Sequence, residues 1–440
     1  MASKQKSKQF NFTDQQPEGA ASAPRILGEY QQKAWEVYQS LPFPTLKDEA
    51  WRRTSLRSLD LESFQLSNGK QRSDGEAKIP DQLLRPVSAE DSGGQALISP
   101  EGVTVTLEDG LAAEGLIFTD LKTAAAEHPQ LLEKIMGSTV PPEEGKFAAL
   151  TAAYGDKGLF LYVPRNMRVD KPLHSLTWAS GSGQALFSQL LIYLEEGASL
   201  DYIHESSSPG ETEKESFLGE NVEIVLGKNA RLTLADLQTL GTNVWSIAHK
   251  NARLERDAHL DWVMGELGSK LNKHFISVDL DGEGAEGQVS ALFFAGGGQH
   301  LSFNTRQNHN APHTNSDLLF KGALKEDGRS VWRGMIYVAP GARNIDGYQA
   351  NRNMILSDQA RSDSIPGLEI LNNDVRCTHG STVGKIDREQ LFYLQARGIP
   401  REQAEQLILQ GFFEVIFGRI PYQSIQDRLW SLIEQKLNLS

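Results

Sequence analysis

Residues 229–264, NARLTLADLQTLGTNVWSIAHKNARLERDAHLDWVM, contain one short turn pattern three times. The pattern is Asn or Asp, then Ala, then a basic side chain, then Leu, and it starts at Asn229, Asn251 and Asp257. Asn and Asp tolerate the left-handed backbone of a tight corner, and Ala fits the crowded inside of the bend. The following Leu can then point into a core. This stretch therefore predicts short strands joined by repeated tight corners.

The same pattern extends in both directions along the chain. It appears at Gly197-Ala198-Ser199-Leu200, and looser copies start at Gly341 and Gln359. Short apolar runs typical of strands recur over some 220 residues: 159–164, 185–194, 222–227, 231–237, 259–264, 291–296 and 330–339. The spacings of 22 residues (229 to 251) and 18 residues (341 to 359) resemble the coils of a parallel β-helix. A β-sandwich or barrel is the alternative, because it also needs many short strands and turns.

The regions on either side of these strands are mainly helical in pattern. Residues 1–150 are predicted to form a mainly helical N-terminal domain with a disordered tail (1–25), helices near 28–40 and 120–136, and a polar loop at 67–95. Trp51 and Leu56 are expected to pack inward. The core would then span 151–385.

Residues 386–440 are predicted to form a C-terminal helical domain. Asp387 and Gln390 form a capping-box-like start, Gly398 and Pro421 separate three segments, and apolar stripes follow in the last two. Three short helices at this position are expected to cap the end of the core and to offer a docking site for a partner.

The bulk composition restricts the function. The 440 residues carry a net charge of −13, which argues against general binding to nucleic acid or to anionic membranes. The single cysteine excludes an internal disulfide framework. No apolar segment suits a signal peptide or a membrane span, so the sequence indicates a cytoplasmic protein. Phosphate-loop, dinucleotide, HExxH and CxxC motifs are absent.

The candidate chemistry is concentrated at Cys377 and His379. In a strand, residues i and i+2 point to the same face, so the thiol and the imidazole would lie side by side. This pair suits zinc, iron or an iron–sulfur cluster, but two ligands cannot complete such a site. Arg376 could lower the pKa of the thiol and favour the thiolate. The alternatives are that another chain completes the site or that the pair is structural packing.

His309 and His313 form a second histidine pair, at positions i and i+4. That spacing could bind a metal on a helix, but Pro312 makes a helix improbable there. A hydrogen-bonded structural role is therefore expected for both side chains.

Several segments resemble the SufB/SufD family, which forms the scaffold of the SUF iron–sulfur cluster assembly system. The most specific is NIDGYQANRNMILSDQARSDSIPGLEILNNDVRCTHGSTVGKIDREQLFYLQARGI (344–399), and QNHNAPHTNSDLLFKG, VWRGMIYVAPGA and LPFPTLKDEAWRRTSL resemble the same family. The resemblance implies a mainly β fold: a right-handed parallel β-helix between N-terminal and C-terminal helical regions.

The resemblance also implies partners and site residues. SufB and SufD members pair with each other, and their C-terminal helical regions carry the ABC-type ATPase SufC. The motif histidine, a cluster or iron ligand at the SufB–SufD interface, corresponds to His379, and the motif cysteine corresponds to Cys377. SufB members carry a functional cysteine where this chain has Asn351, which favours SufD. The cluster would be transient and completed by the partner.

Two other functions remain open from the sequence. One is a purely structural adaptor, in which Cys377 and His379 only pack the last coil. The other is a β-helical enzyme acting on polysaccharides, although such enzymes are usually exported. An isolated chain could also form a homodimer, because an unpaired strand edge seeks another strand.

Overall fold

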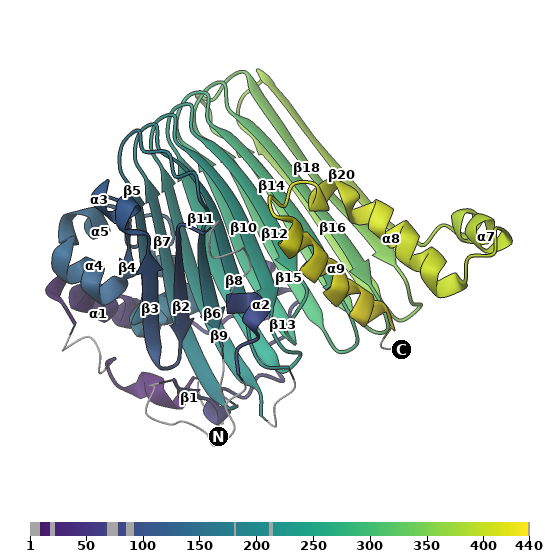
Figure 1. Cartoon of the computed structure of the whole chain (residues 1–440), viewed down its shortest axis with the longest axis horizontal. Helices are drawn as coiled ribbons and strands as arrows, with labels where there is room; N and C mark the ends of the chain where they lie inside the picture. Colours follow the sequence, from purple (N-terminus) through teal and green to yellow (C-terminus); the bar gives the residue numbers. More distant parts are fainter. Residues whose placement is uncertain are drawn as a thin grey trace.

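The computed structural model describes residues 9–17, 23–67, 78–84, 92–179, 182–210 and 214–438. Two ten-stranded sheets run along the molecule, and the chain passes from one to the other in successive coils (Figure 1). The coils from residue 157 to residue 385 form the predicted parallel β-helix, so the predicted mainly β fold class is confirmed.

The two sheets contain alternate strands of the β-helix, and strands of the N-terminal region extend both of them. Sheet A contains β4 (Ile117–Asp120), β5 (Lys157–Val163), β7 (Gln184–Leu194), β9 (Ser216–Leu226), β11 (Val244–Leu254), β13 (Leu271–Leu280), β15 (His300–His309), β17 (Arg329–Val338) and β19 (Arg361–Ile370), with β1 (Gln65–Leu66) paired to β7. Sheet B contains β3 (Gly102–Leu107), β2 (Gly94–Ser99), β6 (Leu173–Trp178), β8 (Ser199–Ser207), β10 (Arg231–Thr239), β12 (His259–Glu266), β14 (Glu286–Ala295), β16 (Asn315–Leu324), β18 (Ile345–Ile355) and β20 (Val375–Lys385).

A left-handed residue marks one corner of each successive coil. These residues have positive φ and lie 27 to 32 positions apart: Asn166, Gly197, Asn229, Asp257, Gly284, His313 and Asn344. Their backbone N–H groups link neighbouring coils; Asn229 donates to the Arg256 carbonyl at 2.9 Å and Asp257 donates to the Glu283 carbonyl at 3.0 Å. Ala198, Ala230 and Ala258 follow in these corners and are fully buried. The predicted corner chemistry is confirmed.

The predicted coil spacing was wrong. Asn251 is not in a corner but inside β11, where its side chain donates to the Thr139 carbonyl at 2.6 Å. Neighbouring coils are in register over longer distances, as when Arg231 of β10 pairs with His259 of β12. Each coil contains one strand from each sheet. A coil therefore needs about twice as many residues as a single strand with its turn.

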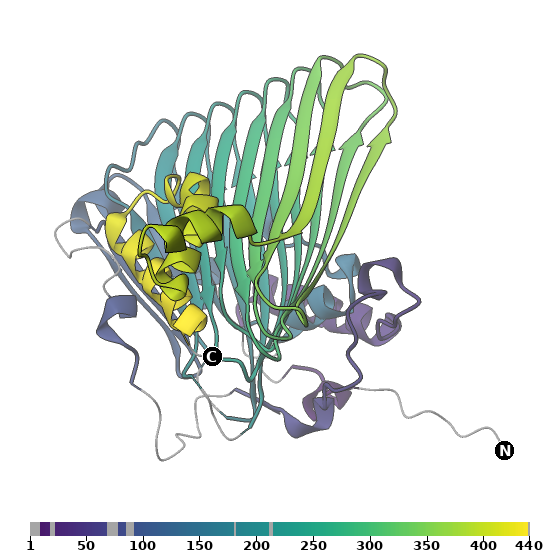
Figure 2. The ribbon, with the colours of Figure 1, turned by 90° about the vertical axis from the view of Figure 1, so that its right-hand side faces the viewer.

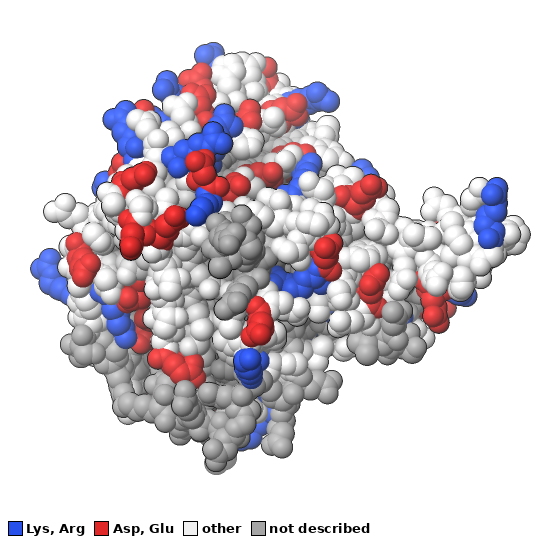
Figure 3. Space-filling view, in the orientation of Figure 1, with Lys and Arg blue, Asp and Glu red and all other residues white. Residues whose placement is uncertain are grey.

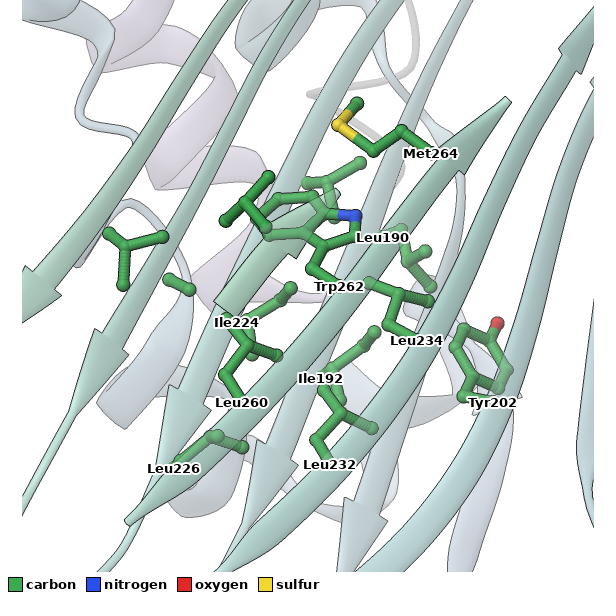
Figure 4. Packing of buried hydrophobic residues seen from close by; sticks show 14 of the residues in the cluster. Leu190, Ile192, Tyr202, Ile224, Leu226, Leu232, Leu234, Leu260, Trp262 and Met264 are labelled. Carbon is green, nitrogen blue, oxygen red and sulfur yellow. The ribbon is translucent and has the colours of Figure 1, made fainter. Parts of the chain in front are cut away.

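Apolar side chains fill much of the interior in stacked rows. Ile192 pairs with Ile224 on sheet A, and Leu232 pairs with Leu260 on sheet B (Figure 4). Burial of a Leu or Ile side chain contributes about 1.5–3 kcal/mol, so repetition over many coils supplies most of the stability. Each coil buries this face only by stacking on its neighbours.

A charged pair also lies inside the β-helix. Lys250 Nζ is 2.8 Å from both carboxylate oxygens of Asp236, and Trp262 Nε1 donates to the same carboxylate at 3.3 Å. Burial alone would lower the pKa of Lys250, but the attraction of Asp236, Glu266 and Glu220 outweighs it and raises the pKa. The ammonium group therefore stays charged in the core.

Most of the N-terminal region packs on sheet A, whereas Leu83 packs against Leu176 and Trp178 of β6 in sheet B. Its helices are α1 (Arg25–Ser40), α2 (Asp81–Leu84), α3 (Asp109–Ala113), α4 (Leu121–Glu127), α5 (Pro129–Ile135) and α6 (Lys146–Tyr154). Trp51 and Leu56 are buried, as predicted, in a cluster with outward-facing Phe217 of β9. The predicted boundary at residue 150 falls inside α6.

The predicted disordered tail is wrong for residues 9–17. Asn11–Asp14 form a 3-10 helix, and Phe10 is buried against Phe217, with ring centroids 5.1 Å apart. Residues 1–8 and 18–22 lie outside the described part of the chain, as do 68–77 and 85–91 of the predicted loop.

The C-terminal helices lie on the flank of the β-helix. They are α7 (Arg388–Ala396), α8 (Arg401–Phe417) and α9 (Gln423–Asn438). Leu409, Phe413 and Leu429 pack against outward-facing apolar residues of sheet B such as Val263 and Leu292 (Figure 2). The prediction that these helices cap the end of the β-helix was therefore wrong.

Among the described helices, none is long and apolar enough to cross a membrane.

Candidate functional site

Strand β20, which carries Cys377 and His379, is the last strand of sheet B. One edge of β20 pairs with β18, where Cys377 lies beside Gly347 and His379 beside Gln349. In the part of the chain that is described, no strand pairs with the other edge, and sheet A ends in the same way at β19. Both sheets therefore end in rows of unpaired backbone groups at one end of the β-helix.

The interior is open to solvent at this end. Gln349 of β18 is buried, yet His379, its register partner on β20, is exposed because no further coil covers it. Leu368 of β19 and Val383 of β20 are 37% and 48% exposed for the same reason. We call this surface, formed by β19 and β20, the open end.

Cys377 and His379 share one side of β20, as the strand spacing predicted. Cys377 is half-buried and packs against the apolar cluster of Ile336 and Ile345. His379 is exposed one step further along the strand. The structure thus presents one accessible imidazole with a less accessible thiol beside it.

The expected effect of Arg376 on the thiol is wrong. Burial raises the pKa of Cys377, and the nearby charge of Asp346 raises it further. Arg376 is adjacent in the strand and therefore points to the opposite face, where its Nη1 lies 3.6 Å from Asp346 Oδ2. The thiol is therefore protonated at neutral pH, and a metal would have to displace this proton.

Gly347 keeps space open between Cys377 and His309. A Cβ atom at position 347 would lie 3.2 Å from Cys377 Sγ and 3.3 Å from His309 Nε2. The two side chains therefore approach each other across the glycine, although they come from β20 and β15. Sequence reasoning missed this proximity, because the two residues are on different sheets.

The predicted structural role of His309 is confirmed by its hydrogen bonds. Nδ1 is 2.7 Å from Thr314 Oγ1, and Nε2 is 2.8 Å from Ser316 Oγ. His313 lies in a corner with φ 60°, and its Nε2 is 3.8 Å from Glu283 Oε1. The two histidines have different partners, which agrees with the preference for structural roles over a helical metal pair.

Burial lowers the pKa of His309 to about 4 from a usual value of 6.5. Between these two pH values the unfolded chain binds more protons at this residue than the folded chain, so its contribution to stability falls as the pH falls. We predict that the stability difference between the wild type and His309→Gln shrinks as the pH is lowered from 6.5 to 4. Urea unfolding at several pH values measures it, and a pH-independent difference would contradict this assignment.

Asn351 lies one coil inside the open end. It is buried, and its Nδ2 donates to Ser364 Oγ of β19 at 3.1 Å, while its Oδ1 has no partner among the described residues. Gln349 donates to the Gly367 carbonyl at 2.8 Å. These amides make the interior polar near the open end. In the sequence, the polar residues at alternate positions of Gln349-Ala350-Asn351-Arg352-Asn353 are the signal from which this polar interior could have been predicted.

Within the described residues, no three His, Cys, Asp or Glu side chains are grouped so as to hold a metal ion. Among those residues, Cys377 and His379 therefore have no third side chain of these types grouped with them.

A second surface lies on the C-terminal helices. A groove of about 750 Å³ between α7 and α8 is lined by residues that include Phe392, Tyr393 and Leu407. Phe392 is 73% exposed. Figure 1 shows α7 projecting away from the β-helix, and Figure 3 shows that much of the surface there is uncharged. We call this surface the α7–α8 groove.

The fold and these two surfaces define a β-helical protein with an open end at β19 and β20 and an apolar groove on a projecting helical arm. The family model "SUF system FeS cluster assembly, SufBD core domain" matches residues 177–412, and "SufBD protein N-terminal region" matches residues 2–174. The chain belongs to the SufBD family of iron–sulfur cluster assembly proteins.

Named relatives agree with this assignment. An iron–sulfur cluster assembly SufBD family protein of Staphylococcus haemolyticus (strain JCSC1435) is 32% identical over 332 residues, which cover 76% of this chain and 71% of the relative. A protein of the same name from Staphylococcus aureus (strain MRSA252) is 33% identical over the same shares of both chains.

Proposed function

We propose that this chain is the SufD-type scaffold subunit of a SUF complex, and that its open end pairs with a SufB-like subunit. The observation that carries the proposal is the exposed His379 on an unpaired edge, beside an incomplete ligand set. The iron–sulfur cluster is the cargo of the complex and is assembled transiently between the two subunits. His379 supplies one ligand from this side.

Asn351 favours the SufD type over the SufB type. An amide cannot form the thiolate that accepts sulfur, so a cysteine with that role has to come from the partner. Cys377 is a second candidate ligand, but its half-buried and protonated thiol also suits a packing role. The function requires no catalytic group in this chain.

Backbone pairing and apolar contact both support a SufB-like partner at the open end. The unpaired edges of β19 and β20 offer N–H and C=O groups to strands of a second chain. Leu368, Leu371 and Val383 are exposed beside these edges and would be buried on docking. Without the partner, a second copy of this chain could occupy the same edges as a homodimer.

The α7–α8 groove is the proposed docking site for a SufC-like ABC-type ATPase. Exposed aromatic side chains around a concave surface are typical anchors of a protein interface. ATP hydrolysis would then occur in the partner, and movement of the docked helices would reach the open end through the stiff β-helix.

Two charge substitutions are predicted to separate the two partners. Val383→Asp should abolish copurification of the SufB-like subunit and leave the ATPase bound. Phe392→Asp should release the ATPase and leave the SufB-like subunit bound. Each buries an unpaired carboxylate in one interface only, and each residue is exposed in the free chain, so folding is retained. The measurement is the stoichiometry of the complex after affinity purification.

If each variant loses one partner and keeps the other, the open end and the α7–α8 groove are separate docking sites. Loss of both partners in both variants would contradict separate docking sites. Recovery of the chain alone or only as a homodimer from cells that produce all three proteins would contradict the proposed complex.

A further inference from the structure

A basic recess lies on the outer face of sheet A, where three strands of the last coils begin. It has a volume of about 210 Å³ and is lined by Arg53, His300, Arg329, Ser330, Val331, Arg361 and Asp363. His300, Arg329 and Arg361 are the first residues of β15, β17 and β19 and are register partners in adjacent coils. The parallel strands thus place three nitrogen-bearing side chains in one row, about 4.8 Å apart at the backbone.

Positive charge exceeds negative charge in this recess. Asp363 is the only carboxylate among the residues that line it, and it faces Arg53 at 3.6 Å and Arg361 at 3.2 Å. Arg329 forms no hydrogen bond or ion pair through its guanidinium group with any residue in the described part of the chain. Three guanidinium groups around one carboxylate stand out in a chain with a net charge of −13.

His300 lines one side of the recess as a neutral side chain. Its Nε2 atom is buried and has no hydrogen-bond partner among the described residues. Burial lowers the pKa of His300 to about 4, helped by the charges of Lys273 and Arg329, so the ring is neutral at pH 7. The positive charge of the recess therefore comes from its three guanidinium groups.

We propose that this recess binds a phosphate group. Guanidinium groups match the oxygens of phosphate in charge and in fork geometry, and they remain charged at every physiological pH. At about 210 Å³, the recess has room for one tetrahedral anion. The bound group would join Arg53 of the N-terminal region to β17 and β19, and so fasten that region to the coils that form the open end.

Calorimetric titration of the full chain with inorganic phosphate, at constant ionic strength with chloride as the reference anion, tests the proposal. Saturable binding is expected. Arg329→Gln should weaken it about tenfold or more, because a charge-assisted hydrogen bond contributes about 1.5–3 kcal/mol. Arg231→Gln is the matched control, since Arg231 is also the exposed first residue of a strand but belongs to sheet B. Its affinity for phosphate should equal that of the wild type.

A second titration with adenosine monophosphate identifies the source of the phosphate group. Binding of both compounds with the same dependence on Arg329 would indicate a site for phosphate monoesters. Binding of inorganic phosphate alone would indicate a site for the free anion. Absence of saturable binding by either compound, or equal weakening by Arg329→Gln and Arg231→Gln, would overturn the proposal.

Discussion

Replacement of His379 by alanine is expected to reduce cluster formation by the assembled complex by at least about 100-fold. Loss of a residue that merely orients a metal ligand already costs about 10–100-fold, and loss of a ligand should cost more. The side chain is exposed, so its removal leaves no cavity, and the variant should fold and bind both partners. The measurement is the iron and sulfide content of the purified complex, followed by its absorption spectrum after anaerobic reconstitution.

Two control variants sharpen this test. His313→Ala removes another partly exposed histidine, one that lies in a corner and faces Glu283, and it should leave cluster formation unchanged. Cys377→Ala separates the two roles of the thiol: a ligand would lower cluster content, whereas a packing residue would lower only the midpoint of unfolding. Normal cluster content in His379→Ala, with its partners bound, would contradict the ligand role and favour a purely structural adaptor.

Among the substitutions proposed for this chain, Lys250→Met is expected to lower the free energy of unfolding the most, by about 3–5 kcal/mol. It removes the ammonium group that holds Asp236 and leaves a buried carboxylate whose remaining side-chain donor, among the described residues, is Trp262 Nε1 at 3.3 Å. Methionine fills a similar volume but cannot pair with the carboxylate. Denaturant unfolding followed by tryptophan fluorescence measures the change.

The double variant Lys250→Met/Asp236→Leu should recover much of that loss, because it removes both charges together. Lys228→Met is the surface control: Lys228 is exposed, and its substitution should change stability by no more than about 0.5 kcal/mol. A loss in the double variant as large as the sum of both single losses would show that Lys250 and Asp236 act independently, against their observed contact.

The open end could be predicted only in part. The spacing of Cys377 and His379 placed both side chains on one face of a strand, because alternation is a local property of extended backbone. Whether that strand was covered depended on where the C-terminal helices pack. Apolar stripes on α8 and α9 showed that these helices pack against something, but only the outward-facing Val263 and Leu292 decided that they lie along the flank.

The sequence by itself determined the corner chemistry, the strands, the three C-terminal helices and the family. Each of these depends on residues close together in the chain: a left-handed residue followed by alanine, an apolar run, or a contiguous motif. The tertiary structure alone decided the coil length, the approach of His309 to Cys377 across Gly347, and the basic recess. Those features join residues about 30 positions apart or more, either in register between strands or on different sheets, and their placement is fixed by how the coils stack, which no local pattern specifies.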